Sequence, residues 1–301
     1  PSDALALSLS NTGAVDIDYM ADLTGQKPAD VVKALKGFIY KDPATNTYVT
    51  AEEYLSGNVR EKLEIAEFWG KTDPEAAANI EALKKVQPVD LTPEEISVNL
   101  GTPWIPESDL RDFAQEMLGM PSWEQPLDIR FNKPAGTWLV AWNRGWRADE
   151  AKHGTEATQK WGTPRRNFAN LLDDALNQRT PTVYDTSSDG KRSVNQQETL
   201  AAQQKLREIQ DEFKKWIWKD KDRAERLAAY YNRNFNNMRL REYNGSMLTL
   251  PGYSSVAPPL KQHQKDAVWR IIQDGTALLA HTVGAGKTWT MQTAAMELKR
   301  L

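Results

Sequence analysis

The sequence feature that most constrains the fold lies at the end of the 301-residue chain. An apolar run typical of a buried strand precedes a glycine-bearing turn, which leads through Lys287 and Thr288 into a helix. This order predicts a phosphate-binding loop at the opening of an α/β lobe that is cut off before it is complete. The expected segments are an amphipathic helix over 260–272 ended by Gly275, the strand Ala277–Ala280, the turn 281–286 and the helix 289–301.

The residue types in this turn suit a phosphate ligand. Gly284 and Gly286 leave room for backbone N–H groups to turn toward phosphate oxygens, and the helix N-terminus adds its dipole. Lys287 is expected to reach the β- and γ-phosphates, and the Thr288 hydroxyl is expected to bind Mg²⁺ through the nucleotide. The predicted cofactors are therefore ATP and Mg²⁺. The predicted loop residues are Thr282, Val283, Gly284, Ala285, Gly286, Lys287 and Thr288.

Two further residues narrow the class of nucleotide site. His281 stands where the strict phosphate-loop pattern has glycine, which disfavours small GTPases and many kinases and suits helicase superfamily 2. Gln264 precedes Gly286 at the order of spacing at which those enzymes place a glutamine that reads adenine. The alternative is a solvated glutamine on a helix, and only the pairing of Gln264 with the loop favours the nucleotide role.

Further stretches extend the similarity over nearly the whole chain. They are His263-Gln264 with Arg270-Ile271 and 278–288, residues 54–63, Pro103–Pro106, and Tyr231-Asn232 with Phe235-Asn236 and Arg239. In these stretches the chain resembles the methylase–helicase fusion proteins of phages, plasmids and conjugative elements, including the phage defence-against-restriction B type. In that family an N6-adenine methyltransferase domain commonly precedes this region, and the rest of a superfamily 2, SNF2-type helicase follows it. The chain itself has no methyltransferase Asn-Pro-Pro-Tyr-type motif.

The resemblance implies an internal fragment of an ATP-dependent DNA helicase or translocase. Its partners would be DNA, the remainder of the helicase and a possible methyltransferase domain. Hydrolysis also needs a downstream Asp-Glu pair and an arginine from a second lobe. Because the sequence stops at Leu301, in the helix that follows Lys287, no complete set of catalytic residues and no ATP turnover are expected. The competing interpretation is a non-catalytic DNA- or protein-binding module with an incidental phosphate-loop stub. A small kinase is disfavoured by the late position of the loop and by Gln264.

Five regions are expected along the chain, within a mixed and mainly α fold. The first has helices, a short strand at Ala14–Ile17, a helix at Ala29–Lys36 in the recognition-helix position and a hairpin, an order that predicts a winged helix. The regions are winged-helix-like (1–55), a helical accessory region (56–125), a small α+β region (126–190), a long helical linker region (191–250) and the truncated start of a RecA-like lobe (251–301).

Local patterns predict the elements inside these regions. Three tryptophans near helix ends, Trp69, Trp104 and Trp123, are expected to close small cores. The apolar stripe of the long helical region is expected to be a packing seam. The predicted elements are helices over 59–68, 74–86, 93–100, 108–118 and 163–176, a hairpin of 127–131 with 137–142, a polar loop at 143–162, a strand at 182–184, and one helix over 195–232, or two with a break near Lys219.

Composition excludes several function classes. The chain has no cysteine, which excludes disulfides and thiol catalysis and fits a reducing cytoplasm. Its three histidines lie far apart in sequence, so a histidine-based metal site is not expected. No apolar stretch is long enough to cross a membrane, and no secretory leader is visible.

Charge is divided unevenly along the chain. Residues 1–127 carry 10 Lys+Arg against 22 Asp+Glu, whereas residues 128–301 carry 28 against 19. The second part is therefore the better candidate to face a polyanion, although two solvated faces would give the same counts.

Basic residues in two places are candidate nucleic-acid contacts. Lys33 and Lys36 lie on the expected recognition helix, but their surroundings are acidic, so protein contact or simple packing are alternatives. Arg233, Arg239 and Arg241 are interleaved with asparagines and Tyr243 and are candidates for a nucleic-acid path. A capped helix end that leads into a loop is the alternative for these arginines.

Overall fold

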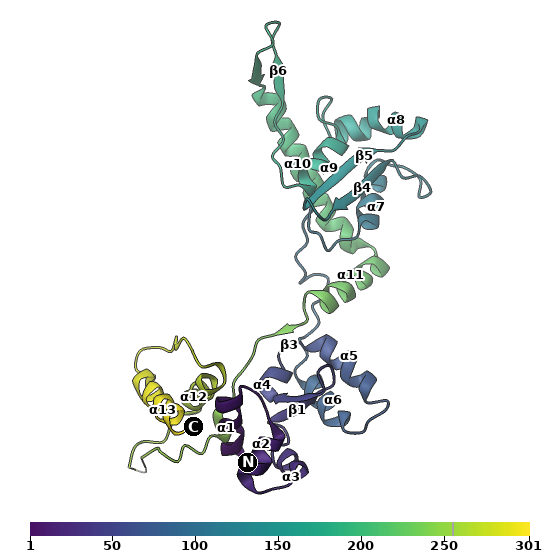
Figure 1. Cartoon of the computed structure of the whole chain (residues 1–301). Coiled ribbons are helices and arrows are strands. Elements are labelled where there is room, and N and C mark those ends of the chain that lie inside the picture. Colours follow the sequence, from purple (N-terminus) through teal and green to yellow (C-terminus); the bar gives the residue numbers. More distant parts are fainter. Residues whose placement is uncertain (255) are drawn as a thin grey trace. The chain divides into compact units, whose positions relative to one another are not determined.

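The computed structural model describes residues 1–254 and 256–301. The chain forms two compact units, of which unit 1 consists of residues 1–89 and 235–301, and unit 2 of residues 90–234 (Figure 1). Unit 2 is thus inserted in sequence between the two parts of unit 1. The described residues are mainly helical, and their strands form four two-stranded antiparallel sheets. Among them, no helix combines the length and the apolar character that crossing a bilayer needs.

The first part of unit 1 has three short helices followed by a two-stranded wing, in the predicted order. The side chain of Asp16 accepts the N–H of Tyr19 and so caps the second helix, and Pro28 stands at the first turn of the third. In the wing, Ile39 lies opposite Thr50. The elements are α1 (Ser2–Thr12), α2 (Ile17–Thr24), α3 (Pro28–Ala34), β1 (Ile39–Asp42) and β2 (Thr47–Thr50).

The remainder of unit 1 joins sequence segments that lie far apart. Gly57 pairs with Arg239, and Asn58 with Met238, in a short antiparallel sheet that the sequence did not predict. The remaining elements are α4 (Ala51–Tyr54), β3 (Gly57–Asn58), α5 (Val59–Trp69), α6 (Ala76–Lys85), β8 (Met238–Arg239), the 3-10 turn η2 (Gly245–Met247), α12 (Gln262–Asp274) and α13 (Lys287–Arg300).

One hydrophobic core unites the N-terminal helices with α12 and α13. Trp269 of α12 is fully buried in it, and its indole Nε1–H donates to Glu52 Oε1 at 3.0 Å. The same carboxylate oxygen accepts the backbone N–H of Asn244 at 3.3 Å. The buried members of this core include Leu5, Met20, Val31, Leu35, Ile39, Val268, Trp269, Ile272 and Ala294.

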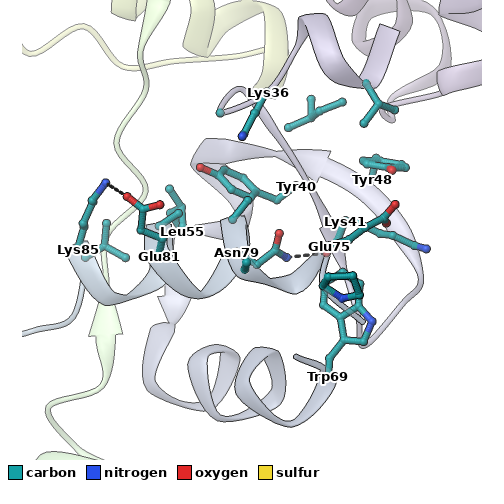
Figure 2. Close-up of a pocket in the computed structure, with 18 residues that line it drawn as sticks. Lys36, Tyr40, Lys41, Tyr48, Leu55, Trp69, Glu75, Asn79, Glu81 and Lys85 are labelled. Carbon is teal, nitrogen blue, oxygen red and sulfur yellow. Dashed lines mark hydrogen bonds and ion pairs between the residues drawn. The ribbon is translucent and has the colours of Figure 1, made fainter. Parts of the chain in front are cut away.

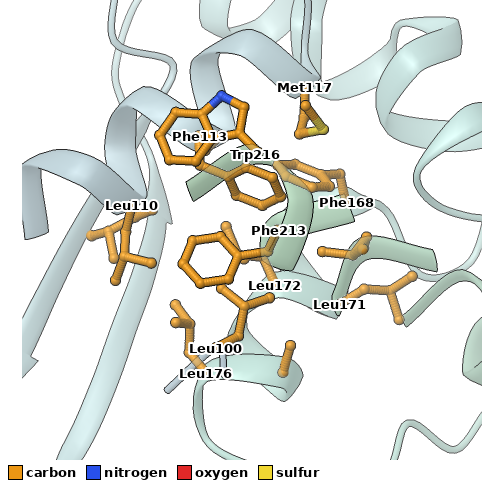
Figure 3. Packing of buried hydrophobic residues seen from close by; sticks show 14 of the residues in the cluster. Leu100, Leu110, Phe113, Met117, Phe168, Leu171, Leu172, Leu176, Phe213 and Trp216 are labelled. Carbon is orange, nitrogen blue, oxygen red and sulfur yellow. The ribbon is translucent and has the colours of Figure 1, made fainter. Parts of the chain in front are cut away.

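Unit 2 packs helices against a β-hairpin. At its centre, the ring of Phe113 lies 5.1 Å from Phe213 and 5.3 Å from Trp216, in edge-to-face contacts (Figure 3). The apolar stripe of the long helices thus packs into a core, as predicted. The elements are α7 (Glu107–Met117), β4 (Leu127–Asn132), β5 (Thr137–Trp142), α8 (Trp146–His153), the π-helix η1 (Glu156–Lys160), α9 (Phe168–Leu176), β6 (Tyr184–Thr186), β7 (Arg192–Val194), α10 (Gln196–Lys219) and α11 (Lys221–Asn234).

Two predictions of local structure are wrong, because packing against the rest of unit 2 outweighs the local sequence pattern. The segment Pro93–Leu100 is not a helix, since Ile96, Val98 and Leu100 are buried at every second position, the period of an extended chain. The predicted polar loop at 143–162 instead contains α8 and the π-helix, which bury one alanine each.

Two predicted strands do not form in the described residues. The Ala14–Ile17 segment is held by the Ser8 hydroxyl, which donates to Ala14 O at 2.7 Å and accepts the Asp16 N–H at 2.9 Å. The segment Ala277–Ala280 pairs with no described strand, and Leu278 is 85 % exposed. A strand needs a hydrogen-bonded neighbour, so apolar composition alone did not suffice. In the described residues, α12 and α13 are therefore not accompanied by a paired strand, and the RecA-like lobe stays a prediction.

The buried indole of Trp269 should dominate the stability of unit 1. We expect Trp269→Ala to lower the free energy of unfolding by about 3–5 kcal/mol, because it opens a cavity and leaves the buried Glu52 carboxylate with only the Asn244 N–H as a donor. Urea unfolding followed by circular dichroism measures the loss, and hydrogen exchange assigns it to unit 1.

The matched control is Phe68→Ala in the same unit, because Phe68 is 74 % exposed. This change should stay within about 0.5 kcal/mol of the parent protein. Similar losses for the two variants would contradict the role given to Trp269.

Candidate phosphate-binding site

The predicted phosphate-binding loop connects α12 to α13, which pack against each other in unit 1. The loop is folded around the side chain that follows it. Lys287 Nζ donates to the backbone oxygens of His281 at 2.8 Å and of Thr282 at 3.0 Å. These two bonds curve the chain so that the ammonium group lies over the turn between the two helices.

The N-terminus of α13 has the properties of an anion site. Gly286 is the N-cap residue, and the first helical hydrogen bond runs from Thr290 N to Gly286 O at 3.0 Å. The N–H groups of the residues between them therefore have no acceptor within the helix. No acidic residue stands in the first turn, so no carboxylate offsets the positive end of the helix dipole.

Gln264 lies beside this loop, as its spacing predicted. Its side chain is buried, and its Oε1 accepts the N–H of Lys261 at 2.8 Å. Its Nε2 donates to the backbone oxygens of Ala285 at 3.3 Å and Gly286 at 3.4 Å. The carboxamide thus ties the start of α12 to the end of the loop.

His263 is a neighbour of the loop that sequence reasoning did not select. Its Nε2 lies 3.1 Å from Ala285 O, and its ring meets the ring of His281 edge-on at 5.2 Å. The His281 Nδ1 atom is buried and has no hydrogen-bond partner in the described part of the chain. His263 and Gln264 both contact the carbonyl oxygen of Ala285. The sequence signal that could have indicated His263 was its position next to Gln264.

The rest of the loop faces solvent. Val283 is 99 % exposed, and Thr282, Gly284 and Thr288 are exposed as well. The Thr288 hydroxyl is therefore accessible at the first turn of α13, where the prediction requires it for a metal-bound nucleotide. In the described residues, no group of three or more His, Cys, Asp or Glu side chains could hold a metal by itself.

The candidate recognition helix α3 borders a groove within unit 1. Lys33 and Lys36 are exposed, and Lys36 lies at the edge of a cavity of about 730 Å³ whose opposite wall is α6 (Figure 2). Burial raises the pKa of Tyr40, which lines the same groove. Glu81 accepts a hydrogen bond from Lys85 at 2.6 Å, so acidic and basic groups alternate along the groove. This mixture lacks the single positive sign that a phosphate backbone favours.

The three candidate arginines are divided between the two units. Arg233 belongs to unit 2, whereas Arg239 and Arg241 belong to unit 1. Arg239 is paired with Glu242 at 2.7 Å, and Arg241 lies 3.1 Å from Glu53. The carboxylates offset much of the positive charge that these two arginines carry. The assignment of the three residues to nucleic acid stays a prediction.

Two family models match parts of the chain. Residues 1–49 match the model described as "Probable helicase, winged helix domain", which corresponds to α1 through most of β2. Residues 99–237 match a domain of unknown function, DUF8437. The searches of curated proteins and of solved structures found no match. The N-terminal match connects the chain with helicases. The two matched segments correspond to the winged helix and to most of unit 2.

Substitution of the two loop glycines should separate backbone strain from the contact with Gln264. Both have left-handed backbones, with φ of +84° at Gly284 and +81° at Gly286, so alanine costs about 1–2 kcal/mol at either position. A Cβ on Gly286 would stand 2.3 Å from Gln264 Nε2, whereas Gly284 faces open space. We expect Gly286→Ala to destabilise unit 1 by about 1 kcal/mol more than Gly284→Ala, since it also displaces the carboxamide. Urea unfolding of the two variants measures the difference, and equal losses would contradict this contact.

Proposed function

We propose that the chain is part of an ATP-dependent superfamily 2 DNA helicase or translocase, and that its loop 281–288 binds the phosphates of ATP. The observation that carries the proposal is the position of Lys287, held over the N-terminus of α13 by the loop's own carbonyl groups. The match of residues 1–49 to the winged helix of a probable helicase supports the same class.

In this proposal each loop residue has a distinct role. The N–H groups around Gly284, Ala285 and Gly286 cradle the phosphate oxygens, and Lys287 contacts the β- and γ-phosphates. The Thr288 hydroxyl contributes a ligand to Mg²⁺, which neutralises phosphate charge when bound. Thr282 and Val283 shape the outer side of the turn.

Gln264 is the proposed adenine reader. A carboxamide can accept a hydrogen bond from adenine N6 and donate one to N7, whereas guanine presents an acceptor at the corresponding O6. Gln264 is supported in this role by its bonds to the loop, because they place its amide within the same site as the phosphate-binding turn. Binding of adenine would exchange one or both of these weak carbonyl contacts for bonds to the base.

We expect at best weak nucleotide binding, without turnover, from these 301 residues. Hydrolysis by enzymes of this class uses carboxylates that hold Mg²⁺ and position the attacking water. After Lys287 the sequence has one acidic residue, Glu297, which is buried and paired with Arg300 at 2.7 Å. The residues described here would therefore bind the nucleotide, and DNA, the remaining helicase lobes and a possible methyltransferase domain would be the partners of the whole system.

A second candidate is a non-catalytic DNA- or protein-binding module. It is favoured by the unpaired and exposed state of the segment Ala277–Ala280, which a complete nucleotide-binding lobe would pair with other strands. The two candidates differ in one measurable property, the affinity for ATP.

Isothermal titration calorimetry with ATP and MgCl₂ tests the proposal. We expect Lys287→Ala to weaken binding at least about tenfold, because it removes a charge-assisted contact to phosphate. Lys299→Ala is the matched control, since Lys299 is an exposed lysine in the last turn of the same helix and should leave binding unchanged.

The same titration with GTP tests the role of Gln264. We expect Gln264→Ala to reduce the preference for ATP over GTP. If Gln264 has only a structural role, its loss should instead lower the affinity for both nucleotides equally. Absence of ATP binding, or equal effects of Lys287→Ala and Lys299→Ala, would favour the non-catalytic module instead.

A further inference from the structure

Unit 2 exposes two tryptophans that its core does not use. Trp123, in the loop between α7 and β4, is 80 % exposed, and Trp146, the first residue of α8, is 72 % exposed. The sequence led us to expect Trp123 to close a small core, and this expectation is wrong. Trp289 is the other exposed tryptophan in the described residues, at 40 %, and the remaining eight are half-buried or buried. Aromatic rings of this size are rarely left in water without a partner.

The backbone segments that carry these rings are fixed to each other. Glu124, next to Trp123, pairs with Arg147, next to Trp146, at 2.7 Å. Asn143 strengthens the connection, since its N–H donates to Pro126 O at 2.9 Å and its Nδ2 to Gln125 O at 2.7 Å. Both tryptophans are thus displayed on anchored segments, so a ligand would not have to order the backbone that presents them.

The cation available beside Trp146 is Arg144. Residues 143–166 carry six Lys+Arg against three Asp+Glu, but four of these basic residues are paired with carboxylates, namely Arg147, Lys160, Arg165 and Arg166. Arg144 and Arg147 flank Trp146, and the guanidinium carbon of Arg147 lies 5.0 Å from the centre of its ring. Arg144 is exposed and makes no ion pair in the part of the chain that the structure describes. An arginine free to bind an anion therefore stands two residues from an exposed indole.

We infer that Trp123 and Trp146, with Arg144, form a stacking platform for single-stranded nucleic acid. Unpaired bases stack on tryptophan irrespective of their identity, because every base has a π-face, and the phosphates between them are attracted by the arginine. Bases in a duplex are already stacked on one another, so a double strand would use only the positive charge. The platform lies within the segment that matches the domain of unknown function and is separate from the phosphate-binding loop.

An unpaired cation distinguishes this surface from an apolar protein-docking site. A protein docking site built on two tryptophans would be expected to have an apolar surround, whereas here the exposed Arg144 stands two residues from Trp146. The combination of accessible rings and a neighbouring cation is the arrangement that single-strand-binding grooves use.

Fluorescence anisotropy of a labelled 30-nucleotide oligothymidine, titrated with the full chain at low salt and without nucleotide, tests the platform. We expect Trp123→Ala and Trp146→Ala each to weaken binding about tenfold, and Trp→Phe at either position to retain most of the affinity. Arg144→Gln should weaken binding and lower the slope of log affinity against log salt by about 0.7. An oligouridine of equal length shows whether DNA or RNA is preferred.

Leu200→Ala is the matched control, because Leu200 is a 66 % exposed apolar residue of α10 in the same unit. It should leave the affinity unchanged, and all variants should keep the parent's circular dichroism because the altered side chains are exposed. A duplex of the same length should bind more weakly and should not respond to the tryptophan changes. No binding of either single strand, or equal losses for Leu200→Ala and the tryptophan variants, would overturn the proposal. The proposal would also be overturned if the tryptophan changes weakened binding to anionic vesicles or to a protein partner but did not affect binding to the oligonucleotides.

Discussion

The hydrogen bond between Trp269 and Glu52 is the contact on which unit 1 depends. It joins α12, near the end of the sequence, to the helix that follows the N-terminal wing, and both groups are buried. A buried carboxylate without donors is strongly unfavourable, so the indole and the Asn244 N–H are needed to keep Glu52 in place. Because α12 also carries Gln264, this contact fixes the helix from which the carboxamide reaches the loop.

Elements with strong local signals could be predicted from the sequence. The helices α12 and α13, the hairpin of β4 and β5 and the break between α10 and α11 near Lys219 all agree with their patterns. Pairing between distant segments could not be predicted, since no local signal connects Gly57 with Arg239. The segment Ala277–Ala280 shows the opposite case, in which a strand is predicted but does not form. Its composition is that of a buried strand, but a strand has to pair with a neighbour, and the described residues supply none.

The spacing of residues in the sequence agrees with two contacts of the loop 281–288, while its role in phosphate binding stays a proposal. The separation of Gln264 from Gly286 placed the carboxamide beside the turn, and Lys287 lies over the loop that precedes it. The basic candidates were less predictable, because the charges of Arg239 and Arg241 are offset by carboxylates, one of which comes from the distant α4. Counting basic residues along the sequence could not reveal these partners, nor could it show which tryptophans are exposed.

The insertion of unit 2 into unit 1 has a consequence for the order in which the chain folds during synthesis. Residues 90–234 are continuous, so unit 2 has all of its core as soon as α11 has left the ribosome. Unit 1 has to wait, because Val31 and Leu35 pack in the same core as Val268 and Trp269, which are made only after the whole of unit 2. Until then the winged helix exposes apolar side chains that its final partners will cover, and closure of unit 1 requires a contact of very long sequence separation. Early folding of unit 2 shortens the effective loop that must close, since it replaces the flexible stretch 90–234 with one compact body.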